Sequence, residues 1–502
     1  MITPAHMGQA FSLSFFLLSI TAAAQPSLRL PIGITRGMTP IESLLTAEDL
    51  NYESRKTRIL LVGGLDGDRG AAKVVQEAFT WYLTNNRIRK YTVSAVPLAN
   101  PEKVTIEGFP PKGEAYGMNA EAHYLWRWIG MHAPDLVVVI GPDMGLIDAL
   151  NKNAPAHTGT IPARTINATG KFMPSLIATL DREKFHGPSP ARAAIQKRLA
   201  RKPSEVAREL AIYYGHDLND AVYIPAVALI ARIRMGDTAA VEQIVKPYTD
   251  GVKASLPEKP TASHLSGHLV FAELFEKTKN PRYQELVRAA ASKAMNHTIY
   301  SEMSDGVFMG CPILAKAGRF DEMVDLMNDM RKLCLRPDGL YRHSPLDETA
   351  WGRGNGFPAL GLASSLGELP GNHPDFAPML LAFQQHMSTL AQHQDPSGMW
   401  HEVIDRHESY REFTATAMIA YSMSRGIRLG WLDRSSYSPR IQRAWYALRA
   451  RIGGDGGLVD VCTGTGKQKS LRDYLDRPAI LGRDPRGGAM ALLFAAELAA
   501  GN

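Results

Sequence analysis

The chain has 502 residues, of which 45% are hydrophobic and 21% charged, and its formal net charge is +6. This length is too great for one ordinary domain and allows two or three, each with its own hydrophobic core. A modest positive charge spread over the whole chain argues against a nucleic-acid-binding protein and would attract an acidic substrate only weakly. The densest basic stretch, Arg192–Lys202, lacks interleaved aromatic side chains and predicts a solvated helix face.

The N-terminus has the pattern of a signal peptide. Residues 10–20 form an apolar run of the length of an h-region, and three alanines at 22–24 supply a small-residue cleavage site. The n-region contains no Lys or Arg, which leaves a retained anchor as the alternative, although the apolar run is too short for an ordinary membrane span. We expect residues 1–24 to be removed and the mature protein to lie in the periplasm or outside the cell, without a membrane span.

Strands alternate with helices in the first part of the chain. Three β-branched apolar runs predict strands, and two segments between them have helical spacing. The expected strands are Arg58–Gly64, Tyr91–Val96 and Leu136–Ile140, and the expected helices are Ala71–Leu83 and Asn119–Met131. This alternation is typical of a small α/β domain with a largely parallel sheet, which we assign to residues 25–185. Residues 186–203 begin with Pro and Gly and predict a linker.

From about Ser204 onward strand-like runs become scarce and amphipathic helical segments take over. These segments are His264–Lys277, Pro281–Met295, Arg319–Leu333, Phe376–Gln392, Phe413–Arg425, Ile441–Ile452 and Gly487–Ala500. About 300 residues of helical hairpins are enough for a closed ring of twelve helices, an (α/α)6 toroid. We therefore predict an all-α domain over residues 204–502, with a cleft at the end of the ring where the loops of the inner helices converge.

Glycines lie beside chemically capable side chains in three segments of the helical part. The segments are Ser304–Pro312, Trp351–Gly356 and Gly398–Glu402. Because glycine lets a ligand approach the backbone closely, this pattern indicates a carbohydrate site. The three cysteines, Cys311, Cys334 and Cys462, are too few and too widely spread for a disulfide framework, and their spacing predicts no metal site. We expect no cofactor.

These segments resemble the unsaturated glucuronyl and rhamnogalacturonyl hydrolases of glycoside hydrolase family 105 and the related family 88. The resemblance extends over roughly residues 260–500 and rests on six segments in the family's order. The segments are Ser304–Pro312, Gly339–His343, Trp351–Phe357, Gly398–Asp405, Tyr410–Leu432 and Gly482–Glu497.

The resemblance implies an enzyme that removes a 4,5-unsaturated uronyl residue from the non-reducing end of oligosaccharides made by a polysaccharide lyase. A carboxylic acid protonates C4 of the enol ether, water adds at C5, and the resulting hemiketal collapses to a keto-uronate and a shortened glycan. Ordinary glycosidases instead place two carboxyl groups on either side of the anomeric bond.

The resemblance also implies roles for individual residues. Asp305 matches the general acid and base, whereas a cap of the following helix is the structural alternative. Arg353, in a W-x-R-G-N-G loop, would pair with the substrate carboxylate, and Trp351 would stack on the sugar ring. A structural Arg bonded to loop carbonyls beside a packed Trp is the alternative for this pair.

Two histidines, His343 and His401, resemble family residues that line the cleft, and Trp400 lies beside the second of them. Each His has a purely structural role as its alternative. The family's second acidic residue is absent from Thr261–Leu269, where His264 is the candidate replacement. Otherwise a nearby carboxylate, such as Asp217 or Asp220, takes its place.

The first domain carries a second, weaker resemblance. Gly63–Gly70 is similar to the zinc-binding turn of carboxypeptidase-like metallopeptidases, but Asp66 and Arg69 occupy the positions of the metal-binding His and Glu. Since a cationic Arg would repel zinc, we expect a metal-free domain, and a peptidase, the third hypothesis, would require zinc. The alternative to a hydrolase is therefore a non-catalytic glycan-binding protein built from two degenerate enzyme domains.

Overall fold

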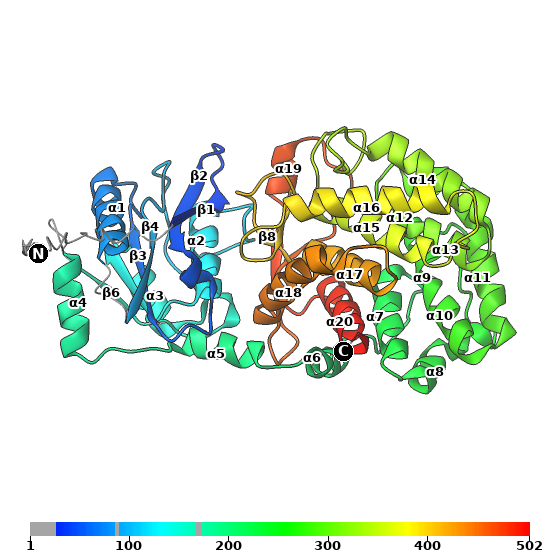
Figure 1. The fold of residues 1–502 in the computed structure, drawn as a ribbon, viewed down its shortest axis with the longest axis horizontal. Helices are drawn as coiled ribbons and strands as arrows, with labels where there is room; N and C mark the ends of the chain where they lie inside the picture. The colour runs from blue at the N-terminus through cyan, green and yellow to red at the C-terminus, as the bar shows by residue number, and fades with distance from the viewer. Residues whose placement is uncertain (1–26, 86–89, 167–171, 502) are drawn as a thin grey trace, which may run out of the picture.

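The computed structural model describes residues 27–85, 90–166 and 172–501. An α/β part precedes a helical part, and Figure 1 shows the two side by side. The predicted signal peptide lies outside the described residues. None of the described helices is long and apolar enough to cross a membrane.

A mixed sheet forms the centre of the α/β part. Within the described residues its strand order is β1-β2-β4-β3-β5-β6. The strands are β1 (Ser27–Ile34), β2 (Pro40–Thr46), β3 (Thr57–Gly63), β4 (Tyr91–Val96), β5 (Leu136–Ile140) and β6 (Ala163–Thr165). β4, β3, β5 and β6 pair in parallel, and β1 and β2 are antiparallel. The three predicted strands and the largely parallel sheet are confirmed, while β1 and β2 were not predicted.

Helices connect the parallel strands, since a parallel pair needs a crossover connection. They are α1 (Arg69–Thr84), α2 (Ala120–His132) and α3 (Leu146–Lys152), and α4 (Met173–Arg182) follows β6. The carboxylate of Asp68 caps α1 by accepting the N–H groups of Gly70 and Ala71. α2 is buried on nearly all sides, since one hydrophobic cluster joins it both to the sheet and to the helical part.

The predicted linker, residues 186–203, is not an extended spacer. It contains α5 (Pro190–Leu199), whose Ala191, Ile195 and Leu199 belong to the hydrophobic cluster that joins the two parts. The helix also contacts α18 (Arg434–Ala450) of the helical part, so it lies between the two parts, and the chain continues into the helical part after it (Figure 1).

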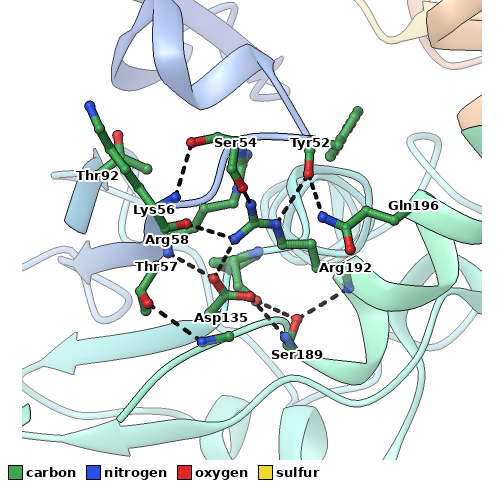
Figure 2. A network of polar contacts seen from close by, with 12 residues as sticks. Tyr52, Ser54, Lys56, Thr57, Arg58, Thr92, Asp135, Ser189, Arg192 and Gln196 are labelled. Atoms are coloured by element: carbon green, nitrogen blue, oxygen red, sulfur yellow. Dashed lines mark hydrogen bonds and ion pairs between the residues drawn. The ribbon is translucent and has the colours of Figure 1, made fainter. Parts of the chain in front are cut away.

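The expectation of a solvated face for Arg192–Lys202 is wrong at its first residue. Arg192 is 3% exposed and forms an ion pair of 2.7 Å with Asp135 (Figure 2). The guanidinium also donates to the main-chain carbonyls of Tyr52, Ser54 and Lys56. This charge can be buried because one carboxylate and three carbonyls satisfy it.

The helical part is a ring of inner helices with outer helices around it. Among the described residues, the inner helices contact one another in the order α7, α10, α13, α15, α17, α20 and back to α7. They are α7 (Tyr223–Arg234), α10 (Leu269–Thr278), α13 (Cys311–Lys316), α15 (Gly352–Leu366), α17 (Phe413–Arg428) and α20 (Pro485–Ala500). This closed ring is the arrangement expected of an (α/α)6 toroid.

The outer helices alternate with the inner ones along the chain. They are α6 (Pro203–Ala211), α8 (Thr238–Thr249), α11 (Pro281–Ala294), α14 (Phe320–Cys334), α16 (Phe376–Gln392) and α18 (Arg434–Ala450). Short elements lie between them: α9 (Ala262–Gly267), α12 (Gly306–Met309), α19 (Leu471–Leu475), β7 (Trp400–His401), β8 (Arg411–Glu412), β9 (Leu458–Cys462) and β10 (Ala479–Gly482). All seven predicted helical segments are confirmed.

Candidate active site

Chemically capable side chains converge where the inner helices begin. Ser304, just before α12, ties two other segments together: its N–H donates to the carbonyl of His343 over 2.9 Å, and its hydroxyl donates to the carbonyl of Gly354 over 2.7 Å. These two hydrogen bonds hold Asp305, His343 and the start of α15 close together. The structure therefore brings together four of the predicted site residues, Asp305, His343, Trp351 and Arg353.

Asp305 has an unpaired carboxylate oxygen. Its side chain is 15% exposed, and Oδ1 is buried with no hydrogen-bond partner among the residues that the structure describes. The side chain makes no capping bond to α12, so the alternative role as a helix cap is wrong. The chain approaches it through Ser301 and Glu302, which have φ angles of 53° and 56°. Non-glycine residues rarely adopt this conformation, and such strain is typical of functional sites.

His343 lies against Asp305 on one side and Tyr474 on the other. Its Nε2 is 3.5 Å from Oδ1 of Asp305, and its Nδ1 is 3.0 Å from the Tyr474 hydroxyl. The imidazole is fully buried and packs on Trp351, with ring centroids 4.4 Å apart. Tyr474 belongs to α19, so a segment about 130 residues further along the chain fixes the orientation of this histidine.

Trp351 is 1% exposed, and its indole faces protein groups. The Arg353 guanidinium lies 4.7 Å from the ring centroid, and the indole N–H donates to Oε1 of Glu402 over 2.9 Å. In this structure the indole packs against Arg353 and His343 and holds both side chains in place. The sugar stacking expected of Trp351 would need a movement that exposes the ring.

Arg353 is part of the first turn of α15, which corrects its expected position in a loop. Its guanidinium donates to the carbonyl of Cys462 over 2.7 Å and to that of Thr463 over 2.6 Å. The only side chain bonded to it in the described structure is the hydroxyl of Thr414, at 3.4 Å. These partners are uncharged, so the guanidinium keeps its capacity to bind a carboxylate.

Glu402 is a buried carboxyl group next to this cluster. Burial, together with the nearby negative charge of Glu412, raises the pKa of Glu402 to about 8. Oε2 has no hydrogen-bond partner in the described part of the chain, whereas Oε1 accepts hydrogen bonds from Trp351 and from the thiol of Cys462. Glu402 is therefore protonated at neutral pH, and it holds the indole in place.

Tyr223, at the start of α7, lies near both Asp305 and Arg353. Burial raises the pKa of the Tyr223 phenol, the positive charge of Arg353 opposes that rise, and the charge of Asp305 adds to it. The ring packs edge-on against Phe308 and Phe357, which follow Asp305 and Arg353 in the chain. The two ring contacts place Tyr223 next to the cluster.

The segment that lacks the expected acidic residue has a carboxylate beside it. Nε2 of His264 is 3.4 Å from Oδ2 of Asp220, and Nδ1 of His264 accepts the Thr261 N–H over 3.1 Å. Of the two carboxylates considered, Asp220 is thus the one that contacts His264. The segment is joined to the Asp305 loop, because the Ser266 hydroxyl contacts the sulfur of Met309 at 3.0 Å.

Two predicted site residues have structural roles instead. His401 is fully buried, with Nε2 at 3.2 Å from Asp395 and Nδ1 at 2.6 Å from the carbonyl of Ser409. Trp400 is also fully buried and donates its indole N–H to the carbonyl of Leu390. The structural alternative considered for a lone His is the correct one here.

Sequence reasoning missed three members of the cluster: Tyr223, Glu402 and Tyr474. Glu402 lies in the predicted site segment Gly398–Glu402, but the resemblance to the family pointed to the adjacent His401. No local signal distinguishes Tyr223 or Tyr474, because each reaches the cluster only through packing of distant segments.

The described residues contain no group of three His, Cys, Asp or Glu side chains placed to hold a metal ion. The turn that resembles a zinc site is a helix cap: Asp66 accepts the N–H of Asp68, which in turn caps α1. All three cysteines are buried as free thiols.

Comparisons with known proteins agree with this geometry. A family model described as Glycosyl Hydrolase Family 88 matches residues 219–500. An unsaturated rhamnogalacturonyl hydrolase of Bacillus subtilis is 27% identical over 216 residues, which are 40% of this chain and 61% of that protein. An unsaturated 3S-rhamnoglycuronyl hydrolase of Formosa agariphila is 29% identical over 100 residues, which are 20% of this chain and 26% of that protein. The match thus spans less than two thirds of each relative.

Solved structures show the same fold. A glycoside hydrolase from family 105 of C. acetobutylicum superposes with a TM-score of 0.52 and 22% identity, covering 60% of this chain and 100% of that one. A possible member of family 105 from Salmonella enterica gives a TM-score of 0.51 and 21% identity, covering 60% and 96%. Since the family model matches more than half of the residues, the chain belongs to glycosyl hydrolase family 88.

Proposed function

We propose that the helical part is an (α/α)6 toroid that removes a 4,5-unsaturated uronyl residue from the non-reducing end of lyase-generated oligosaccharides. The observation that carries this proposal is the carboxylate of Asp305, which has a buried, unpaired oxygen at 3.5 Å from His343. Such an acid is free to exchange a proton with a substrate.

In the proposed reaction, protonated Asp305 donates its proton to C4, and the electron pair of the C4–C5 double bond forms the new C–H bond. The positive charge that develops at C5 is shared with the ring oxygen. Water adds at C5 and gives up a proton. The hemiketal then opens by breaking the bond between C5 and the ring oxygen, which leaves a ketone at C5 and a hemiacetal at C1. The hemiacetal collapses to an aldehyde at C1 and releases the aglycone as an alcohol, so one water is consumed per glycosidic bond cleaved.

Arg353 is the proposed partner of the substrate carboxylate, which is attached to C5. Its present partners are uncharged, so an incoming carboxylate would form the charge-assisted pair that the guanidinium lacks. An anionic sugar is therefore favoured over a neutral one.

Asp220, beside His264, is the proposed second carboxylate of the site and would accept the proton of the attacking water. This assignment supplies the acidic group that is absent from the sequence at Thr261–Leu269. The relatives support a rhamnose-linked substrate, because one is named for unsaturated rhamnogalacturonyl and the other for unsaturated 3S-rhamnoglycuronyl hydrolysis.

The test uses the full chain on three lyase digests: pectic, ulvan-like and glycosaminoglycan. We expect the absorbance of the 4,5-double bond to disappear with at least one digest, fastest with a rhamnose-containing one. If no digest loses absorbance while calorimetry detects oligosaccharide binding, the non-catalytic glycan-binding alternative replaces the proposal.

Two further expectations stay predictions. Export through residues 1–24 would be checked by N-terminal sequencing of the protein from its native cell. The expectation that residues 25–185, which resemble a carboxypeptidase-like domain, bind no zinc would be checked by a metal assay on the purified protein.

A further inference from the structure

A buried ion pair joins the α/β part to the candidate active site. Arg127, on α2, contacts Asp460, on β9, with Nη1 at 2.6 Å from Oδ1. The side chains are 10% and 7% exposed. The hydroxyl of Tyr116 donates to the same oxygen over 3.0 Å, and the ring of Tyr116 stacks on Tyr410 at 4.6 Å. The α/β part thus holds Asp460 with two polar side chains.

Asp460 is a strained residue. Its φ angle is 64°, in the left-handed region that non-glycine residues disfavour. Asp460 is also the extra residue of a β-bulge in β9, because Val459 pairs with Leu481 and Val461 pairs with Ile480. Arg127 and Tyr116 hold the side chain of this bulged residue, and Arg127 also neutralises its buried carboxylate.

β9 ends two residues later with the groups that hold Arg353. The carbonyls of Cys462 and Thr463 accept hydrogen bonds from the two terminal nitrogens of Arg353 over 2.7 and 2.6 Å. The N–H of Cys462 is itself fixed by Oε1 of Glu412 over 2.9 Å. A displacement of β9 at Asp460 would shift these carbonyls and, with them, the guanidinium.

We propose that Arg127 of the α/β part is a positioning residue for the active site: together with Tyr116 it fixes Asp460, and β9 transmits this position to Arg353. The α/β part then acts on the binding site for the substrate carboxylate indirectly, by holding Arg353 in position. This inference rests on the proposed function for its kinetic consequence, while its structural consequence can be measured without any substrate.

The structural test compares hydrogen exchange in Arg127→Met with that in Tyr446→Phe. Tyr446 is the matched control because its hydroxyl accepts the Tyr52 N–H over 3.0 Å, also between the two parts but away from β9. We expect faster exchange of the amides of residues 458–463 in Arg127→Met only. Equal exchange in the two variants would overturn the proposal, whatever the activity of the protein.

Removing Arg127 alone leaves a buried, uncompensated carboxylate and can prevent folding. The double variant Arg127→Met/Asp460→Asn removes both charges, and Tyr116→Phe removes only one hydrogen bond. We expect faster exchange over residues 458–463 in both, with the larger change in the double variant. Unchanged exchange in the double variant would also overturn the proposal.

The kinetic test uses an unsaturated uronide as its free acid and as its methyl ester. Because the ester cannot form a charged pair with Arg353, we expect the double variant to raise KM for the acid about tenfold and to leave KM for the ester within about twofold. Equal losses on both substrates would mean that the ion pair serves folding alone. Absence of turnover by the wild type would refute the proposed function and leave the exchange result to decide the positioning role.

Discussion

The two ends of the helical ring differ in how their buried polar groups are satisfied. Where the inner helices begin, Oδ1 of Asp305 and Nε2 of His343 face each other at 3.5 Å without forming a hydrogen bond, and Oε2 of Glu402 is buried with no hydrogen-bond partner among the described residues. A buried polar group without a hydrogen bond costs about 1–3 kcal/mol, so these groups lower the stability of this end of the ring.

At the opposite end, charged groups are paired. Arg234 donates to both oxygens of Glu273 over 2.9 Å and to the hydroxyl of Tyr421 over 2.7 Å. Lys316 contacts Glu276 and lies 2.7 Å from Glu368. The same helices therefore serve stability at one end and leave groups available for chemistry at the other, where the α/β part also packs.

After the loss of the acid Asp305, the largest fall in kcat/KM is expected from a substitution of Arg353. Arg353→Lys keeps a positive charge but loses the planar fork, and we expect kcat/KM to fall about 100-fold. Arg425→Lys is the matched control, because Arg425 also donates to a main-chain carbonyl, that of Ala363, but toward the opposite end. We expect its kcat/KM to stay within about threefold. Similar losses in the two variants would contradict the functional difference between the ends.

Glu273→Gln tests the opposite end of the ring. Breaking its bidentate pair leaves Arg234 without a counter-charge, and we expect the free energy of unfolding to fall by about 2 kcal/mol. Urea denaturation measures this loss. The kcat/KM per folded molecule should not change, and a large loss of activity without a loss of stability would refute the assignment of this end to stability.

A smaller effect is expected at Asp220. Asp220→Asn removes the proposed second carboxylate, and we expect kcat to fall about tenfold. Asp217→Asn is the control, since Asp217 was the other candidate but bonds only to its neighbour Asn219 in the described structure. An unchanged kcat in Asp220→Asn would remove this residue from the mechanism.

The last of these effects is a pH dependence of stability caused by Glu402. Its folded pKa is about 8, above the ordinary value of 4.5, so the folded state keeps a proton that the unfolded state has released between these values. Stability from this group is full below about pH 4.5 and falls as pH rises to about 8, by at most about 1.4 kcal/mol per pH unit. We expect Glu402→Gln to lose this slope in thermal melts over that window. An equally steep slope in the variant would show that other groups cause it.

Local pattern predicted most of the secondary structure. The strand Leu136–Ile140 and the helix Phe376–Gln392 have the predicted bounds, because their apolar periodicity coincides with their burial. Asp305, His343 and Arg353 were also predicted to share a site and do so. Their placement came from the family resemblance, as no local spacing brings residues 305 and 343 together.

The start of α15 could not be predicted from propensity. Gly352, Gly354 and Gly356 disfavour a helix in isolation, and the segment was expected to be a loop. In the ring these small residues allow close packing: a Cβ at Gly352 would lie 2.8 Å from the carbonyl oxygen of His401, and one at Gly361 only 2.3 Å from that of Val307. Tertiary contact thus overrides intrinsic propensity.

The predictions for two polar residues are wrong for the same reason. His401 and Arg192 were assigned from their own segments, whereas their environments depend on partners elsewhere. Asp395 lies six residues before His401, and Asp135 lies 57 residues before Arg192. A buried charge is tolerated only with such a partner, and the sequence does not show which carboxylate folds against which cation.

The central claim is that Asp305 donates a proton to the double bond. The most direct measurement follows the 4,5-double-bond absorbance of a lyase digest with wild type, Asp305→Asn and Asp321→Asn, the last being a control at an exposed carboxylate on α14. We expect wild-type rates with Asp321→Asn and a loss of at least about 1,000-fold with Asp305→Asn, whose melting temperature should not fall. Turnover by a folded Asp305→Asn within about tenfold of the wild type would contradict the account.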